Sequence, residues 1–312
     1  MSPFPYTIVV LAVIAAAGLA AGLLAAAVAG AGSAPADGRP AGRTVAARGF
    51  SYAVLAAVLG LAAWLGTPGV AVLAAGIGAL GLAEWAALAG LPLHHRVALQ
   101  VTNVAIVGLV AALGAGAAEW VVGGATLAGM IWPVVRADPS RAMRDLGFAA
   151  VGTILLPGML AHGIALVVER GALGAATFVA LAVAVAFSDV GAYVVGRRYG
   201  RVALAPRLSP SKTRAGLVGN VAGAALGIAA FAPVLVAGFG IGYTLALIPI
   251  VAVGAVWGDL IESAAKREAG SKDAGTWLPG FGGILDRVDS LLITLPLAYW
   301  SLRLVDLVRG AA

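Results

Sequence analysis

The stretch from Gly258 to Ser290 reads GDLIESAAKREAGSKDAGTWLPGFGGILDRVDS and lies between two long apolar runs. It holds six of the 14 acidic residues of a chain in which only 11% of residues are charged. Charge placed beside apolar sequence is costly and tends to be functional, so this stretch predicts a site. The chain has no cysteine, which excludes thiolate metal sites and cysteine nucleophiles.

Apolar runs of about 20 residues recur on both sides of that stretch. The 312 residues are 61% hydrophobic, and their mean hydropathy is +1.00. Backbone groups in lipid must pair internally, and the runs lack the alternation of barrel strands, so we expect helices. The predicted fold class is all-α, a polytopic integral membrane protein with about nine or ten transmembrane helices. The apolar runs cover residues 6–31, 50–66, 70–90, 97–117, 120–135, 146–168, 173–196, 215–237, 240–261 and 284–302.

The distribution of basic residues predicts the orientation of these spans. With the N-terminus outside, only Arg170, Arg303 and Arg309 of the 20 Lys and Arg residues fall outside. The charged loops therefore face the cytoplasm in a multi-pass protein of the inner (plasma) membrane. They also account for the net charge of +6, so nucleic acid is not an expected partner. We divide the chain into N-terminal membrane helices, 1–145, and a C-terminal catalytic membrane region, 146–312.

Helical spacing places carboxylates on shared faces within the charged stretch. Asp259, Glu262 and Lys266 share one face, where the two carboxylates can hold a hard cation such as Mg2+. The alternative is a solvated helix end with an ion pair between Glu262 and Lys266. Asp286 and Asp289 share a face after a glycine-rich turn, where helix capping is an alternative role for either one.

A second charged loop carries Ser209-Pro210-Ser211-Lys212-Thr213 ahead of the next apolar run. Its hydroxyls and lysine suit a phosphate at the start of a helix, although the pattern is not a P-loop. Asp189 lies near the end of the preceding apolar run, a costly position that indicates function. Carboxylates, basic residues and glycine turns at one membrane face together predict a site for a metal-bound polyphosphate, suited to phosphoryl or nucleotidyl transfer.

The residues from Ser263 to Ser290 closely resemble the signature of the phosphatidate cytidylyltransferases, the CDP-diacylglycerol synthases. The resemblance extends to Gly191-Ala192-Tyr193, to Ser209-Pro210-Ser211-Lys212-Thr213 and to Gly258-Asp259-Leu260. The strong part of the resemblance covers roughly residues 185 to 300. Glu84-Trp85 is more faintly similar to an acidic and aromatic pair of that family.

This resemblance implies that CTP and phosphatidic acid give CDP-diacylglycerol and pyrophosphate at the bilayer. It implies catalytic roles for Asp259, Asp286, Asp289 and Lys266, with Mg2+ on the three aspartates and room for a second cation. A homodimer is also expected from the resemblance. The substrate-binding residues that it implies are Ser209, Lys212, Thr213, Arg267, Lys272, Asp273, Arg287, Asp189, Gly282 and Gly283.

The chain departs from the family at Phe281, where members usually have histidine. Phenylalanine cannot transfer a proton, so one alternative is a degenerate paralogue that binds nucleotide or lipid without turnover. A membrane transporter is a third hypothesis, but transporter charges are expected near the bilayer midplane rather than at one face.

Three further expectations concern single positions outside the charged loops. Glu84 and Glu119 lie near predicted span ends and are expected to face headgroup water. Pro157 is expected to kink its helix. Glycines at 219, 223 and 227 fall on one helix face, which permits close packing of a second helix.

Overall fold

The structure is a computed structural model that describes residues 54–114, 141–270 and 283–310, together with five single positions between 115 and 140. The predicted run at 6–31 and most of the run at 120–135 lie outside the described residues. So do Glu119 and Phe281, and the predicted site residues Lys272, Asp273 and Gly282.

Helices make up nearly all of the described chain, as expected for the all-α class. Five of them are long and apolar enough to cross a membrane, or six if the bent pair Arg214–Ala230 and Ala232–Phe239 forms one span. The predicted class therefore fits, while the count of nine or ten spans is not confirmed. A shorter apolar helix covers Val54–Trp64. The other helices are α3 (Thr67–Ala89), α4 (Leu93–Leu113), α6 (Ala142–Thr153), η1 (Ile154–Gly158), α7 (Met159–Tyr199), α8 (Arg214–Ala230), α9 (Ala232–Phe239), α10 (Ile241–Glu268) and α11 (Leu285–Gly310).

The longest helical segment, Ala142–Tyr199, has 58 residues. At about 1.5 Å per residue an unbroken helix of this length would be about 87 Å long, far more than one crossing of about 30 Å requires. Gly171 breaks it with φ 53° and ψ −127°, and Gly174 then lies directly against the backbone of Leu166. The predicted runs at 146–168 and 173–196 therefore lie on either side of a real break. Pro157 lies in the wider π turn of η1, which fits the expected local distortion.

The predicted run at 215–237 is not one straight helix. α8 and α9 meet at Phe231 with a bend of 77°. Pro233 lies in the first turn of α9. In a continuous helix its ring would clash with the carbonyl four residues earlier, so α8 ends before it.

The described chain packs as two compact units. The first comprises the described part of Met1–Gly66 with Ala175–Ala252, and the second comprises Thr67–Gly174 with Val253–Ala312. Both α7 and α10 contribute residues to each unit. The predicted division of the chain at residue 145 separates a catalytic region from the N-terminal helices. It is a division by function and stays a prediction.

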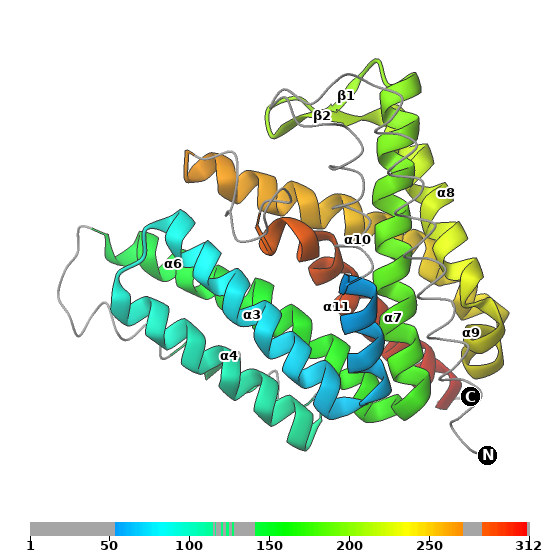
Figure 1. Ribbon diagram of the computed structural model, residues 1–312, viewed down its shortest axis with the longest axis horizontal. Coiled ribbons are helices and arrows are strands. Elements are labelled where there is room, and N and C mark those ends of the chain that lie inside the picture. The colour runs from blue at the N-terminus through cyan, green and yellow to red at the C-terminus, as the bar shows by residue number, and fades with distance from the viewer. Residues whose placement is uncertain are drawn as a thin grey trace. The chain divides into compact units, whose positions relative to one another are not determined.

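Within the first unit, α8 packs along the later part of α7 (Figure 1). A Cβ added at Gly219, Gly223 or Gly227 would clash with backbone atoms of α7, so the expected close packing of this face is confirmed. Beyond α7, β1 (Ala203–Ala205) and β2 (Ser209–Thr213) form an antiparallel hairpin that leads into α8.

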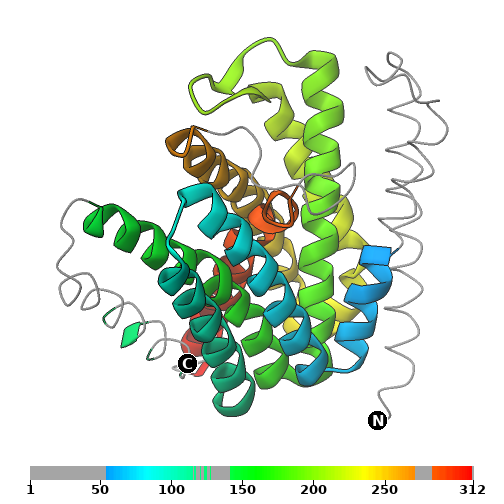
Figure 2. The ribbon, with the colours of Figure 1, turned by 60° about the vertical axis from the view of Figure 1, so that its left-hand side comes forward.

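Within the second unit, α3, α4 and α6 lie side by side (Figure 2). Their contacts with one another and with η1 bury large side chains such as Leu82, Ile106 and Leu156 almost completely. The start of α11 packs against this group through α3. This packing brings Glu84 of α3 next to the chain that precedes the predicted catalytic aspartates.

Candidate functional site

Two glycines of α10 set its distance from α11. A Cβ on Gly254 would meet Thr294, and a Cβ on Gly258 would meet the backbone of Asp289 and Ser290. The hydroxyl of Ser290 donates to the carbonyl of Ala255 at 3.1 Å and fixes the register of the crossing. Small residues thus allow the two backbones to approach closely, and the carboxylates beside this crossing come together.

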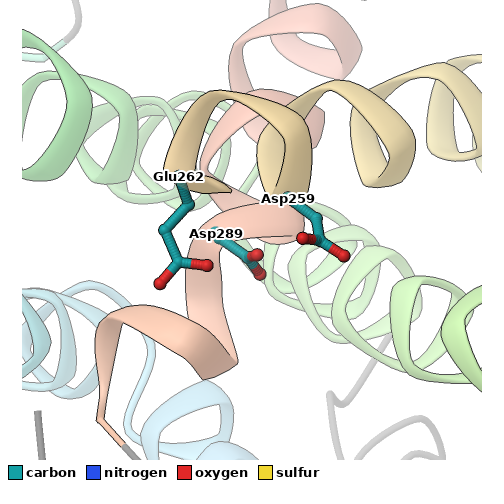
Figure 3. A group of neighbouring side chains, drawn as sticks. All are labelled: Asp259, Glu262 and Asp289. Carbon is teal, nitrogen blue, oxygen red and sulfur yellow. The ribbon is translucent and has the colours of Figure 1, made fainter. Parts of the chain in front are cut away.

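Asp259, Glu262 and Asp289 form what we call the carboxylate cluster (Figure 3). One carboxylate oxygen from each residue lies within 4.8 Å of the other two. Asp259 and Glu262 come from one face of α10, and Asp289 comes from α11. Glu262 and Asp289 are buried, at 2% and 8% exposure. Ionised carboxylates gathered this closely repel one another, and a cation or a shared proton among them relieves the repulsion.

One oxygen of Glu262 lacks a partner, and a cation could satisfy it. Its Oε1 atom is buried without a hydrogen-bond partner. A buried unsatisfied oxygen of a charged group costs several kcal/mol, roughly 3 or more. Mg2+ takes oxygen ligands at about 2.1 Å, which requires ligand oxygens within about 4.2 Å of one another. The spacing of up to 4.8 Å comes close to this, so the residues present fit a divalent cation after a small side-chain adjustment.

Lys266 lies beside the carboxylate cluster and bridges two acids. Its Nζ atom lies 3.0 Å from Glu262 and donates a hydrogen bond to Asp286 at 2.8 Å. The other oxygen of Asp286 accepts the backbone N–H of Gly283 at 2.9 Å. The expected ion pair between Glu262 and Lys266 is present, but it is not solvated, because the Lys266 side chain is only 14% exposed.

The four predicted catalytic residues Asp259, Lys266, Asp286 and Asp289 all lie in the second unit around the crossing of α10 and α11. Asp286 has protein partners on both oxygens, whereas Glu262 contributes the third oxygen of the carboxylate cluster. The predicted metal role of Asp286 stays a prediction. The shared face of Asp259 and Glu262 was the sequence signal that Glu262 lies beside Asp259.

The expectation that Glu84 faces headgroup water is wrong. Glu84 is 2% exposed, and its two carboxylate oxygens accept the backbone N–H groups of Ile284 and Leu285, each at 2.9 Å. These partners lie 200 residues or more away in sequence, so no local pattern could have indicated them. The only available signal was the faint resemblance at Glu84-Trp85.

The predicted substrate-binding residues fall into both units. In the first unit, Ser209 and Lys212 lie on β2, and Thr213 caps α8 by accepting the N–H of Gly216 at 3.1 Å. Asp189 lies exposed on α7 of the same unit. In the second unit, Arg267 and Arg287 are exposed on α10 and α11, and Gly283 is buried against the carboxylate of Glu84.

Comparison with known proteins connects this geometry with a family. A profile of the cytidylyltransferase family matches residues 46–305. The phosphatidate cytidylyltransferase of Brucella suis is 38% identical over 170 residues, which cover 54% of this chain and 58% of that protein. The uncharacterized protein YnbB of Escherichia coli is 32% identical over 176 residues, with the same shares of 54% and 58%. The phosphatidate cytidylyltransferase of Bacillus subtilis is 41% identical over 117 residues, 38% of this chain and 44% of that protein.

These matches differ in extent. The chain spans little more than half the length of the Brucella suis relative, at 58%. The family profile, in contrast, covers residues 46–305 of the 312, including the carboxylate cluster and Glu84. On that match the chain belongs to the cytidylyltransferase family.

Proposed function

We propose that the protein is a CTP:phosphatidate cytidylyltransferase, which makes CDP-diacylglycerol and pyrophosphate. The observation that carries this proposal is the carboxylate cluster beside Lys266, with its unpartnered Glu262 oxygen, on residues that the family profile matches. The names of the Brucella suis and Bacillus subtilis relatives supply the substrate pair, CTP and phosphatidic acid.

In the proposed reaction, a phosphate oxygen of phosphatidic acid attacks the α-phosphorus of CTP. A bond forms between them, and the bond from that phosphorus to the oxygen of the leaving pyrophosphate breaks. Negative charge on the phosphate oxygens must be neutralised during this transfer, which is mostly a task of positioning and electrostatics. Mg2+, when bound, supplies that neutralising charge.

This chain's own residues hold the arrangement in the proposed site. Asp259, Glu262 and Asp289 provide oxygen ligands suited to Mg2+. Lys266 holds Glu262 and Asp286 in place through its two ion pairs. Phosphate binding is assigned through the family resemblance alone, residue by residue, to hydroxyl and basic residues, because charge-assisted hydrogen bonds to phosphate are strong. These residues are Ser209, Lys212, Thr213, Arg267, Lys272 and Arg287.

We also propose that the protein crosses the inner membrane nine or ten times, with its active site on the cytoplasmic side. The argument is the basic-residue distribution, since only three of the 20 Lys and Arg residues then fall outside. A homodimer and a second cation remain part of the proposal through the family resemblance. Mass measurement in detergent and Mg2+ titration test these two points.

The test measures conversion of radiolabelled CTP and phosphatidic acid by the purified full-length protein in detergent with Mg2+. The variants are Asp286→Asn and, as a matched control, Asp306→Asn. Both aspartates lie on α11 and both make an ion pair, but Asp306 pairs with Arg170, away from the carboxylate cluster. We expect product from the native protein and the control, and at least about 100-fold less from Asp286→Asn.

Two results would contradict the proposal. If the folded native protein gives no product, also with other lipid phosphates, the protein is a binding paralogue without turnover. If Asp286→Asn and Asp306→Asn retain the same activity as the native protein, the chemistry does not take place at this crossing of helices.

A further inference from the structure

Glu84 links α3 to the start of α11. It is buried at 2% exposure, and its two oxygens accept the N–H groups of Ile284 and Leu285 at 2.9 Å each. The first N–H groups of a helix have no acceptor within that helix, and a carboxylate placed there satisfies them and complements the helix dipole. Glu84 is therefore an N-terminal cap supplied from a distant part of the chain.

The position of Glu84 is itself fixed by packing. The neighbouring Trp85 is 2% exposed, and its indole N–H donates to the carbonyl of Phe148 on α6 at 2.7 Å. The indole ring also contacts the Phe148 ring, with centroids 5.8 Å apart. A carboxylate carried by a helix that is packed in this way can hold another element precisely.

The start of α11 leads directly to the carboxylate cluster. Asp286 follows the two capped residues, accepts the N–H of Gly283 and receives a hydrogen bond from Lys266. Lys266 in turn pairs with Glu262, and Asp289 lies one turn further along α11. A shift at the capped residues would therefore change the placement of both aspartates relative to α10.

Gly283 provides a second, independent sign of the same contact. A Cβ added at Gly283 would overlap the carboxylate of Glu84. Gly283 is not one of the described glycines with a positive φ, so its backbone conformation does not require glycine. The close approach of Glu84 is what leaves no room for a side chain here. Glycine at position 283 and glutamate at position 84 are therefore two sides of the same contact.

We propose that Glu84 is a positioning residue, which holds the start of α11 so that Asp286 and Asp289 face α10. It acts on the reaction through these aspartates and not by contact with substrate. The catalytic part of this proposal rests on the proposed function, whereas the capping of α11 does not.

The first test compares Glu84→Gln with a matched control, Glu169→Gln. Glutamine keeps the volume of glutamate, but its amide nitrogen cannot accept a hydrogen bond, so one N–H of α11 loses its acceptor. Glu169 also contacts α11, where it accepts the hydroxyl of Tyr299 at 2.7 Å, but far from the first turn. The control therefore removes, from α7, a carboxylate that contacts α11 at another place.

Hydrogen exchange gives a readout that does not depend on activity. We expect Ile284 and Leu285 to exchange about tenfold faster in Glu84→Gln than in the native protein, the effect of about one lost hydrogen bond. Exchange at these residues should be unchanged in Glu169→Gln. In the activity assay, Glu84→Gln should lower kcat about tenfold and raise the Mg2+ concentration for half-maximal rate, with little change in the KM for CTP.

Gly283→Ala changes the other residue of the same contact. This variant replaces Glu84→Gln in the test if Glu84→Gln does not fold. We expect it to accelerate exchange at the same two residues. The double variant Glu84→Gln with Gly283→Ala should be no more impaired than the worse single variant, because both changes break one contact. Additive losses would show that the two residues act separately.

The proposal is overturned if exchange at the start of α11 is the same in Glu84→Gln and Glu169→Gln. It is also overturned if exchange accelerates while kcat and the Mg2+ requirement stay native. If the native protein makes no CDP-diacylglycerol, the proposed function fails on its own. The positioning role is then decided by thermal unfolding, where Mg2+ should stabilise Glu84→Gln less than the native protein and Glu169→Gln.

Discussion

Lys266 places one positive charge between two acids, 3.0 Å from Glu262 and 2.8 Å from Asp286. Lys266→Met keeps the length of the side chain but leaves two carboxylates without their counter-charge. We expect a loss of about 3–5 kcal/mol in the free energy of unfolding, together with loss of activity. Denaturant unfolding in detergent measures the first effect and CTP turnover the second.

Arg303→Met is the control for this change. Arg303 lies 3.8 Å from Glu169 with its side chain 54% exposed, and exposed pairs contribute up to about 1 kcal/mol. If both variants lose the same stability, Lys266 does not act as a buried counter-charge for Glu262 and Asp286.

Metal removal tests the unpartnered Oε1 atom of Glu262. If the carboxylate cluster binds Mg2+, saturation to about 100 times the Kd should add about 2.7 kcal/mol to the free energy of unfolding. EDTA should remove this gain, and Glu262→Gln should greatly reduce it. Thermal unfolding with Mg2+ and with EDTA measures the gain, and Asp306→Asn should retain it in full. A native protein whose unfolding does not respond to Mg2+ would argue against a cation at this cluster.

Residues could be predicted from sequence where their relation is local. Asp259, Glu262 and Lys266 are three and four residues apart, so helical spacing alone placed them on one face. Asp289 was predicted as a metal ligand only through the family resemblance, because local spacing does not show that α10 and α11 cross at Gly258. The role of Glu84 could not be inferred, because capping across 200 residues leaves no pattern in the surrounding apolar sequence.

Between elements, the crossing of α10 and α11 depends on a small residue at Gly258. In Gly258→Ala, the added Cβ would overlap the backbone of Asp289, so the two helices must move apart. We expect activity to fall about 100-fold, as is typical when catalytic groups move by about 1 Å. Gly242→Ala on the same helix is the control, because nothing lies within 4 Å of its Cβ position. Equal activities of the two variants would mean that the crossing distance does not matter.

Whole helices could be predicted where length and hydropathy determine their bounds. They could be predicted less well where the chain changes direction. The runs at 70–90 and 97–117 correspond to α3 and α4 within a few residues. The bend at Phe231 was missed because the run at 215–237 was defined by hydropathy alone, which does not register a change of direction. The β-hairpin was missed because its strands of three and five residues lie in a polar loop.

For the molecule as a whole, the predicted orientation has a direct test, because the chain contains no cysteine. α11 has 26 residues and is therefore about 39 Å long, enough to cross a hydrocarbon core of about 30 Å. Val202→Cys, 52% exposed, should then react with an impermeant maleimide only in inside-out vesicles. Gly310→Cys, exposed at the end of α11, should react only in intact cells or right-side-out vesicles. The native protein should not be labelled, and both variants should be labelled in detergent. Labelling of both positions from one side would refute the topology, since the basic loops and the end of α11 would then share a membrane face.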